Sequence, residues 1–252
     1  IIGQLGQMLI GLSDTVMVGR LGVTELAASS FANTITYLPL MFGIGMSMAV
    51  SIRVSQARGA NEPAAARAAL RHGMYICLGL GVLTVALAFA LVPFLWIFKQ
   101  DPAVVAIAPN FFVLISISLV PAMISMAVKN HADAMNRPWP VFWISLGAVL
   151  LDILLNWKLI FGKLGAPALG LGGAAISTII SRALSLGAMI WWCVRDPGMK
   201  EWVPARWFRA PDWPAVRDLL RTGFPASMQL LAEVSAFVAA SLIIGHMGKD
   251  AL

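Results

Sequence analysis

Long apolar stretches separated by short polar connections run through the whole chain. Residues 74–98 and 111–128 contain no charged side chain. A helix of about 20 apolar residues crosses a bilayer, and these stretches lack the polar face that a helix covering a soluble core would keep. The pattern therefore predicts an all-α polytopic membrane protein. The predicted spans lie near residues 1–19, 25–57, 66–98, 102–128, 139–161, 171–194 and 223–246.

The composition agrees with a membrane protein and narrows its function. Hydrophobic residues make up 59% of the chain and charged residues only 12%, about half the share of a soluble domain. The net charge of +6 does not indicate nucleic acid, because no Lys/Arg cluster is interleaved with aromatics as single-strand binding requires. The motifs of serine hydrolases, zinc peptidases, P-loop proteins and intramembrane aspartyl proteases are missing from the sequence. We therefore expect no enzyme and no cofactor.

The charged connections predict the orientation of the chain. Basic residues mark cytoplasmic loops, and they concentrate after the second, fourth and sixth spans. These residues are Arg58, Arg67, Arg71, Lys129, Arg137, Arg195, Lys200, Arg206, Arg209, Arg217 and Arg221. The opposite side carries Arg20, Lys99, Lys163 and, near a span end, Lys158. The first, third and fifth spans should therefore run outward through the cell (inner) membrane, in contact with its lipids.

The chain divides into three predicted parts: a six-helix lobe over 1–194, a cytoplasmic linker over 195–222, and the first helix of a second lobe over 223–252. In the linker, "DWPAVRDLL" predicts a short amphipathic helix on the membrane face, with Asp212 as its N-cap. "VGRLGVTEL" at 18–26 resembles "IGHMGKDAL" at 244–252, as in transporters built from repeats. Both chain ends fall inside this pattern, so we expect a piece of a longer protein whose second lobe is missing.

Three acids lie deep in predicted spans: Asp14, Asp152 and Glu233. A charge at the centre of a bilayer costs about 2.5–3.5 kcal/mol on insertion scales, so it usually has a function. Asp14 shares one helical face with Gln7, and Glu233 follows Gln229 by one turn. The alternative interpretation of such a face is a polar seam that joins helices.

The fifth and sixth spans carry further polar residues. Asp152 and Asn156 lie on one helical face, where they predict a cation or proton site; an ion pair between Asp152 and Arg182 is the structural alternative. Serines at 177, 181 and 185 favour close helix packing, although Ser177 or Thr178 can lend an oxygen to a cation. The predicted cavity-lining residues are Gln7, Asn33, Thr36, Tyr37, Ser177, Thr178 and Gln229.

These groups indicate a chemistry of ion coupling. A carboxylate in a low-dielectric site can hold a proton, and with amide and hydroxyl oxygens it can coordinate a hard cation such as Na⁺. Either ion would let a gradient drive a conformational cycle. The residues alone therefore predict an ion-coupled transporter. A non-transporting scaffold remains as an alternative, although a scaffold does not need acids at mid-depth in the membrane.

Five stretches resemble the multidrug and toxic compound extrusion (MATE) family, and the resemblance covers the whole chain. They are "DTVMVGRLGVTELAA" (14–28), "KNHADAMNRPWP" (129–140), "LLNWKLIFGKLG" (154–165), "LGGAAISTIISR" (171–182) and "LLAEVSAFVAASLIIGHMG" (230–248). The resemblance implies a MATE-type six-helix lobe followed by a partial seventh transmembrane helix. It also implies an antiporter of two lobes that exports cationic or amphiphilic small molecules by alternating access, driven by inward Na⁺ or H⁺.

The resemblance also implies roles for single residues. Asp14 matches the acid of the family's first span, which couples a cation or proton, and Na⁺ is the candidate ion at Asp14, Asp152 and Asn156. Members often have Asn before Asp in the fifth span, whereas this sequence has Asp152 before Asn156. Glu233 matches the seventh-span acid of the NorM-like branch. A lipid-linked oligosaccharide flippase of the same superfamily is the alternative, but Arg182 is the one deep arginine available for its phosphates.

Overall fold

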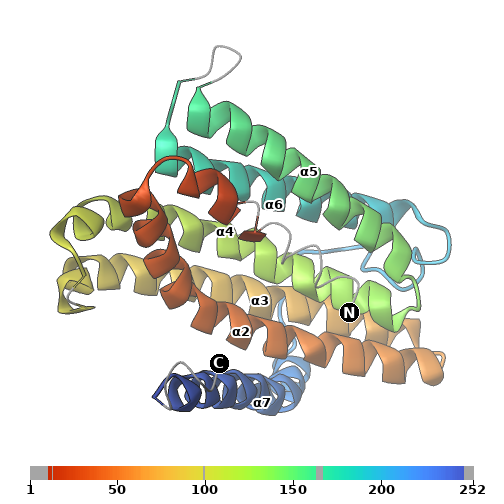
Figure 1. The fold of residues 1–252 in the computed structure, drawn as a ribbon. Coiled ribbons are helices and arrows are strands. Elements are labelled where there is room, and N and C mark those ends of the chain that lie inside the picture. Colours follow the sequence, from red (N-terminus) through yellow and green to blue (C-terminus); the bar gives the residue numbers. More distant parts are fainter. Residues whose placement is uncertain (1–10, 13, 99, 163–166, 247–252) are drawn as a thin grey trace.

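The computed structural model describes residues 11–12, 14–98, 100–162 and 167–246, with side chains up to residue 236. The regular structure within these ranges is helical (Figure 1), and its elements are joined by short connections except over residues 196–212, which link the last two helices. Residues 14–19 form the described end of a first helix. The later elements are α2 (Val23–Gly59), α3 (Pro63–Leu91), η1 (Val92–Phe98), α4 (Pro102–Ala134), α5 (Pro138–Phe161), α6 (Gly170–Arg195) and α7 (Trp213–His246).

Five segments of the described chain are long and apolar enough to cross a membrane: α2, α3 together with η1, α4, α5 and α6. They coincide with the second to sixth predicted spans, so the expected polytopic all-α fold is confirmed. The first predicted span lies mostly outside the described residues.

Helix α4 is the centre of the bundle. It packs against α2, α3 and α6, while α5 packs on the far side of α6 (Figure 1). One buried cluster includes Met123 of α4 with Val50 and Leu70 of the neighbouring helices. A second includes Phe112 of α4 with Ala28 and Ala175. Because α4 contributes to both clusters, it connects the two halves of the apolar core.

The α5–α6 pair is close because a glycine lies at its contact. A Cβ atom at Gly173 of α6 would approach the Leu159 carbonyl oxygen of α5 to 2.6 Å. At the end of α5, Gly162 has the left-handed φ of 64° that suits glycine. These two glycines therefore let α5 and α6 run side by side, which brings the polar face of α5 against α6.

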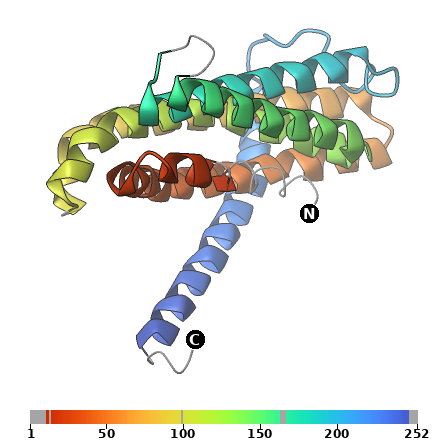
Figure 2. The same cartoon turned by 45° about the horizontal axis from the view of Figure 1, so that its top comes forward.

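Helix α7 differs from the sequence-based expectation. It begins after Asp212 as predicted, but it runs unbroken to His246 and contains Pro225, instead of forming a short amphipathic helix and a separate span. Its first half packs on α2, where Ser227 Oγ donates to the Phe42 carbonyl at 2.9 Å. A Cβ at Gly45 would meet the Ser227 backbone at 2.3 Å. This tight contact holds α7 against α2 two residues after the proline, and the second half of the helix projects away from the bundle (Figure 2).

Candidate functional site

A buried polar cluster forms where the 14–19 helix, α5 and α6 meet. Asp152, Asn156 and Ser181 are fully buried, and Thr178 is 1% exposed. Asp14 is half-buried. The structure therefore brings together acids that are separated by more than a hundred positions in the sequence.

Asn156 bridges the two acids. Its Nδ2 donates to Asp14 Oδ1 at 2.6 Å and to Asp152 Oδ2 at 3.2 Å. Ser181 Oγ donates to Asp152 Oδ1 at 2.8 Å. The Thr178 hydroxyl lies 3.5 Å from Asp14 Oδ2, and it also lies 3.0 Å from the Ala174 carbonyl. Each carboxyl group therefore has a hydrogen-bond donor on α5 or α6, and the amide of Asn156 joins the pair.

Arg182 is the cation of this region, but it does not close an ion pair with Asp152. No ion pair within 4.0 Å joins Arg182 to either acid in the described part of the chain. Its Nη1 donates instead to Ser118 Oγ of α4 at 2.7 Å. The guanidinium still attracts both carboxylates at longer range. With both acids ionised, two negative charges and one positive charge leave the cluster with a net charge of −1.

One acceptor in the cluster has no partner among the described residues. Asn156 Oδ1 is buried and receives no hydrogen bond. An unpaired buried polar atom typically costs about 1–3 kcal/mol. Together with the carboxylate oxygens it supplies the oxygen donors that hard cations prefer. The described residues contain no group of three or more His, Cys, Asp or Glu side chains that would form a transition-metal site.

The other predicted residues of the first lobe lie outside this network. Thr36 and Ser177 are buried, and their hydroxyls donate to carbonyls of their own helices, those of Ala32 and Gly173. Asn33 and Tyr37 are exposed on α2. Gln7 lies outside the described residues. The role of all these side chains as a cavity lining stays a prediction.

Gln229 and Glu233 lie on α7, apart from the cluster. Both are exposed, and Gln229 Nε2 donates to Glu233 Oε1 at 3.2 Å. The structure thus pairs them on one helix face, as their spacing predicted, but it does not bring them to Asp14.

Ser118 and Ser181 join the site although the sequence pattern indicates no role for the first and only helix packing for the second. Ser118 follows Ser116 inside an apolar run, and nothing in that pattern indicates an arginine partner. Ser181 follows Thr178 by three residues, on the face of the helix that meets Asp152. The spacing of three residues from Thr178 could therefore have predicted that Ser181 faces the same site.

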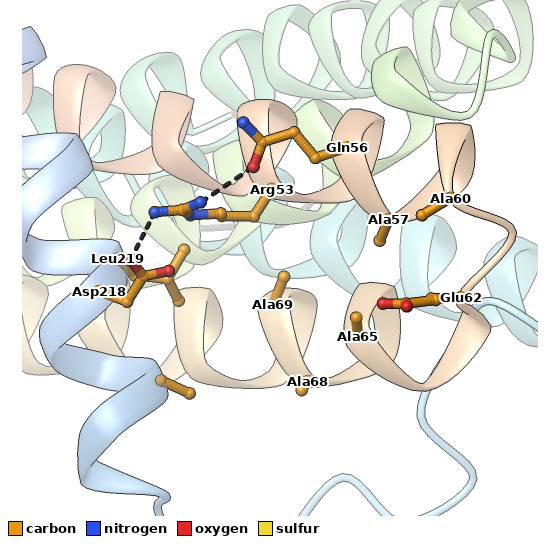
Figure 3. Close-up of a pocket in the computed structure, with 11 residues that line it drawn as sticks. Arg53, Gln56, Ala57, Ala60, Glu62, Ala65, Ala68, Ala69, Asp218 and Leu219 are labelled. Carbon is orange, nitrogen blue, oxygen red and sulfur yellow. Dashed lines mark hydrogen bonds and ion pairs between the residues drawn. The ribbon is translucent and has the colours of Figure 1, made fainter.

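Apart from the buried cluster, a polar pocket lies between α2, α3 and α7, with a volume of about 370 Å³. Figure 3 shows Arg53 reaching from α2 towards Asp218 on α7 and Gln56 on its own helix, above a floor of alanines. Arg53 donates to Gln56 Oε1 at 2.9 Å and forms an ion pair with Asp218. This ion pair joins the start of α7 to α2. The pocket shares no residue with the buried cluster.

Comparison with known proteins identifies the family of the chain. The family model described as MatE matches residues 1–158. The "Probable multidrug resistance protein NorM" of Rhizobium meliloti (strain 1021) is 34% identical over 245 residues, covering 97% of this chain and 52% of that protein. The chain therefore spans about half the length of the curated relatives it matches.

Two solved structures share the fold. One is described as the outward-facing conformation of a multidrug resistance MATE family transporter; it has a TM-score of 0.78, 21% identity and coverage of 94% of this chain and 52% of that chain. The other is described as an inward-facing conformation, with a TM-score of 0.77, 20% identity and coverage of 89% and 50%. The family match covers more than half of the chain and the helical fold agrees with it: the chain belongs to the MatE family of multidrug and toxic compound extrusion proteins.

Proposed function

We propose that this chain forms the ion-coupled lobe of an antiporter in the bacterial inner membrane, which exports cationic or amphiphilic small molecules by alternating access in exchange for Na⁺ or H⁺. A second lobe, joined through α7, completes the transporter. The MatE match and relatives named as multidrug resistance proteins support the substrate class. The acid cluster supports the coupling.

The observation that carries the proposal is the bridged acid pair. Asp14 and Asp152 lie close enough to repel each other, and both contact Asn156. With Arg182 nearby, the ionised cluster has a net charge of −1, which one Na⁺ or one proton neutralises. A bound ion thus removes a buried charge imbalance, which is costly in a low-dielectric setting.

Coupling requires that the ion changes the relative free energy of two conformations. Asp14 lies on the 14–19 helix, whereas Asp152 and Thr178 lie on α5 and α6. An ion held between these elements favours the arrangement in which they approach each other. Without it, the repulsion between Asp14 and Asp152 favours their separation.

The comparisons support a lobe that moves as a unit. The chain matches transporters described as inward- and outward-facing with nearly equal TM-scores, 0.77 and 0.78. A fold that fits both conformations equally is expected if alternating access is mainly a rotation of one lobe against the other. In this scheme Glu233, paired with Gln229 on α7, belongs to a second ion site completed by the other lobe.

The proposal is tested with the complete product of the gene in proteoliposomes. Efflux of a fluorescent cationic dye is followed under an imposed Na⁺ gradient and then under an imposed pH gradient. We expect one gradient to drive efflux in the wild type and Asp14→Asn to reduce it to the rate without a gradient. Thr15→Ala, one position along and exposed, is the matched control and should transport normally.

Two results would contradict the proposal. Gradient-driven efflux that Asp14→Asn leaves unchanged would assign Asp14 to helix packing. Absence of dye movement under every gradient, with movement of a lipid-linked sugar instead, would favour the flippase alternative.

A further inference from the structure

Two adjoining pockets lie where α3 meets the segment that connects α6 to α7, on the side that the basic loops assign to the cytoplasm. The first, of about 540 Å³, contains four arginines: Arg67 and Arg71 of α3 with Arg206 and Arg209 of the connecting segment. The second, of about 840 Å³, is apolar. Phe208 and Arg209 line both pockets, so the two pockets lie side by side.

The lining residues follow one face of α3 in a graded order. Arg67 and Arg71 come first, Tyr75 follows one turn later, and Leu78 and Val82 continue the face into the apolar part of the helix. Leu78 and Val82 are 41% and 54% exposed. From Arg71 to Val82 the helix rises about 16 Å. The order of charge, aromatic ring and apolar side chain matches the order of headgroup, interface and acyl chains in a bilayer.

The connecting segment is held firmly against this face. Tyr75 Oη lies 2.8 Å from the Trp207 carbonyl, to which it donates, and it accepts from the Arg209 backbone N–H at 3.0 Å. Nearby, the Asp212 backbone N–H donates to His72 Nε2 at 3.1 Å. These backbone contacts fix the position of the two arginines of the segment opposite the two arginines of α3.

The four arginines have no anionic partner in the described protein. None of them forms an ion pair within 4.0 Å, and no acidic residue lines their pocket. Arg71 Nε is buried without a hydrogen-bond partner. Four like charges around one cavity repel each other unless an anion is present. The pocket is therefore complementary to a phosphate group.

We propose that this site binds one anionic diacyl phospholipid, with its phosphate among the four arginines and an acyl chain along Leu78 and Val82. The apolar pocket distinguishes this ligand from a free phosphate or a nucleotide, because one of its walls is α3, a helix long and apolar enough to cross the membrane. Basic pockets at the cytoplasmic ends of membrane helices recognise anionic lipid headgroups in this way. Phe208 and Trp213 are 93% and 72% exposed, and they flank the proposed position of the acyl chain as aromatic residues of the membrane interface do.

The test is native mass spectrometry of the chain in detergent, titrated separately with dioleoyl phosphatidylglycerol, dioleoyl phosphatidylcholine and glycerol phosphate. We expect a single phosphatidylglycerol adduct that forms at about tenfold lower concentration than the phosphatidylcholine adduct. Glycerol phosphate, which has the charge without the chains, should give no adduct in this range.

The variants separate a local site from general surface charge. Arg71→Gln with Arg206→Gln removes two charges from the pocket and should weaken phosphatidylglycerol binding about 30-fold. Arg217→Gln with Arg221→Gln removes the same charge from α7, outside the pocket, and should change binding less than twofold. Circular dichroism melting identifies any variant that fails to fold, and the lipid selectivity of the wild type tests the proposal independently of all variants.

Three results would overturn the proposal of a phospholipid site. Equal weakening by both double variants would mean diffuse attraction to a basic surface. Equal binding of the two phospholipids would mean that the arginines recognise no phosphate. Adducts of glycerol phosphate at the same concentration as phosphatidylglycerol would identify a site for free anions.

Discussion

Two pairs of polar side chains in this chain look alike in the sequence and differ in the structure. Asp152 and Asn156 lie four residues apart on α5, and Gln229 and Glu233 lie four residues apart on α7; each pair combines one acid with one amide. The first pair is fully buried and contacts Asp14 and Ser181 on other elements. The second is exposed and bonded within its own helix. In the proposed function, an acid–amide pair serves as an ion site only where other elements close around it.

The largest effect is expected from removing the charge of Asp14. Asp14→Asn should weaken Na⁺ binding by the chain about 10- to 150-fold, because an interaction with a charged group contributes about 1.5–3 kcal/mol. Isothermal titration calorimetry in detergent measures the Na⁺ affinity, with Thr15→Ala as the control. An unchanged affinity would place the Na⁺ ligands elsewhere and leave the cluster as a packing seam or a proton site.

Asn156→Ala is expected to destabilise the folded chain by about 2–3 kcal/mol. The substitution removes the amide that donates to both acids and leaves buried carboxylates with fewer donors. Thermal unfolding followed by circular dichroism gives the value. Thr178→Val, which removes only the long 3.5 Å contact to Asp14 together with a bond to its own helix, should have the smaller effect; a larger loss in Thr178→Val would contradict the bridging role of Asn156.

Gly173→Ala tests whether the closeness of α5 and α6 assembles the site. The added methyl would overlap the Leu159 carbonyl, and overpacking of this kind typically costs about 1–3 kcal/mol. We expect lower stability together with weaker ion binding. Gly187→Ala, where a Cβ meets no atom within 4 Å, is the control. Loss of stability with unchanged ion binding would show that the site tolerates a wider α5–α6 spacing.

Another variant tests whether the order of the acid and the amide on α5 matters for ion binding. The double variant Asp152→Asn with Asn156→Asp keeps the net charge and one acid and one amide on the same helix face, but it replaces the amide that donates to Asp14 with a carboxylate. Because a cation depends on the oxygen ligands and the net charge and not on that amide donor, we expect Na⁺ affinity within about threefold of the wild type, a change below about 0.7 kcal/mol. A loss as large as that of Asp14→Asn would mean that the present order is required.

Glu233→Gln should have the smallest effect. The side chain is exposed and accepts a hydrogen bond from Gln229 of the same helix, and substitutions at such positions usually change stability by less than about 0.5 kcal/mol. Neither the unfolding temperature nor the Na⁺ affinity of this chain should change measurably. A clear drop in affinity would show that the two acid–amide pairs act as one site.

The helical bundle could be predicted from the apolar runs, because each of α2 to α6 is long and apolar and is bounded by proline, glycine or charged residues. The continuous run of α7 was not predicted, because the charged residues up to Arg221 indicated a linker that ends at residue 222 and a separate span from 223, whereas the helix continues through both segments. Helical spacing identified Asp152 and Asn156 as neighbours on one face. It did not identify Ser118 as the partner of Arg182, since that contact depends on how α4 packs on α6.

The unbroken length of α7 gives it a mechanical property. Its 34 residues span about 50 Å, and its contact with α2 at Ser227 leaves an arm of roughly 28 Å beyond that point. The part of α7 beyond Ser227 can tilt as one rigid helix about its contact with Gly45 of α2. A tilt of about 10° at the Gly45–Ser227 contact displaces the far end by about 5 Å, one helical turn. Small rearrangements at the surface of α2 are thus amplified into displacements large enough to change which residues the end of α7 touches.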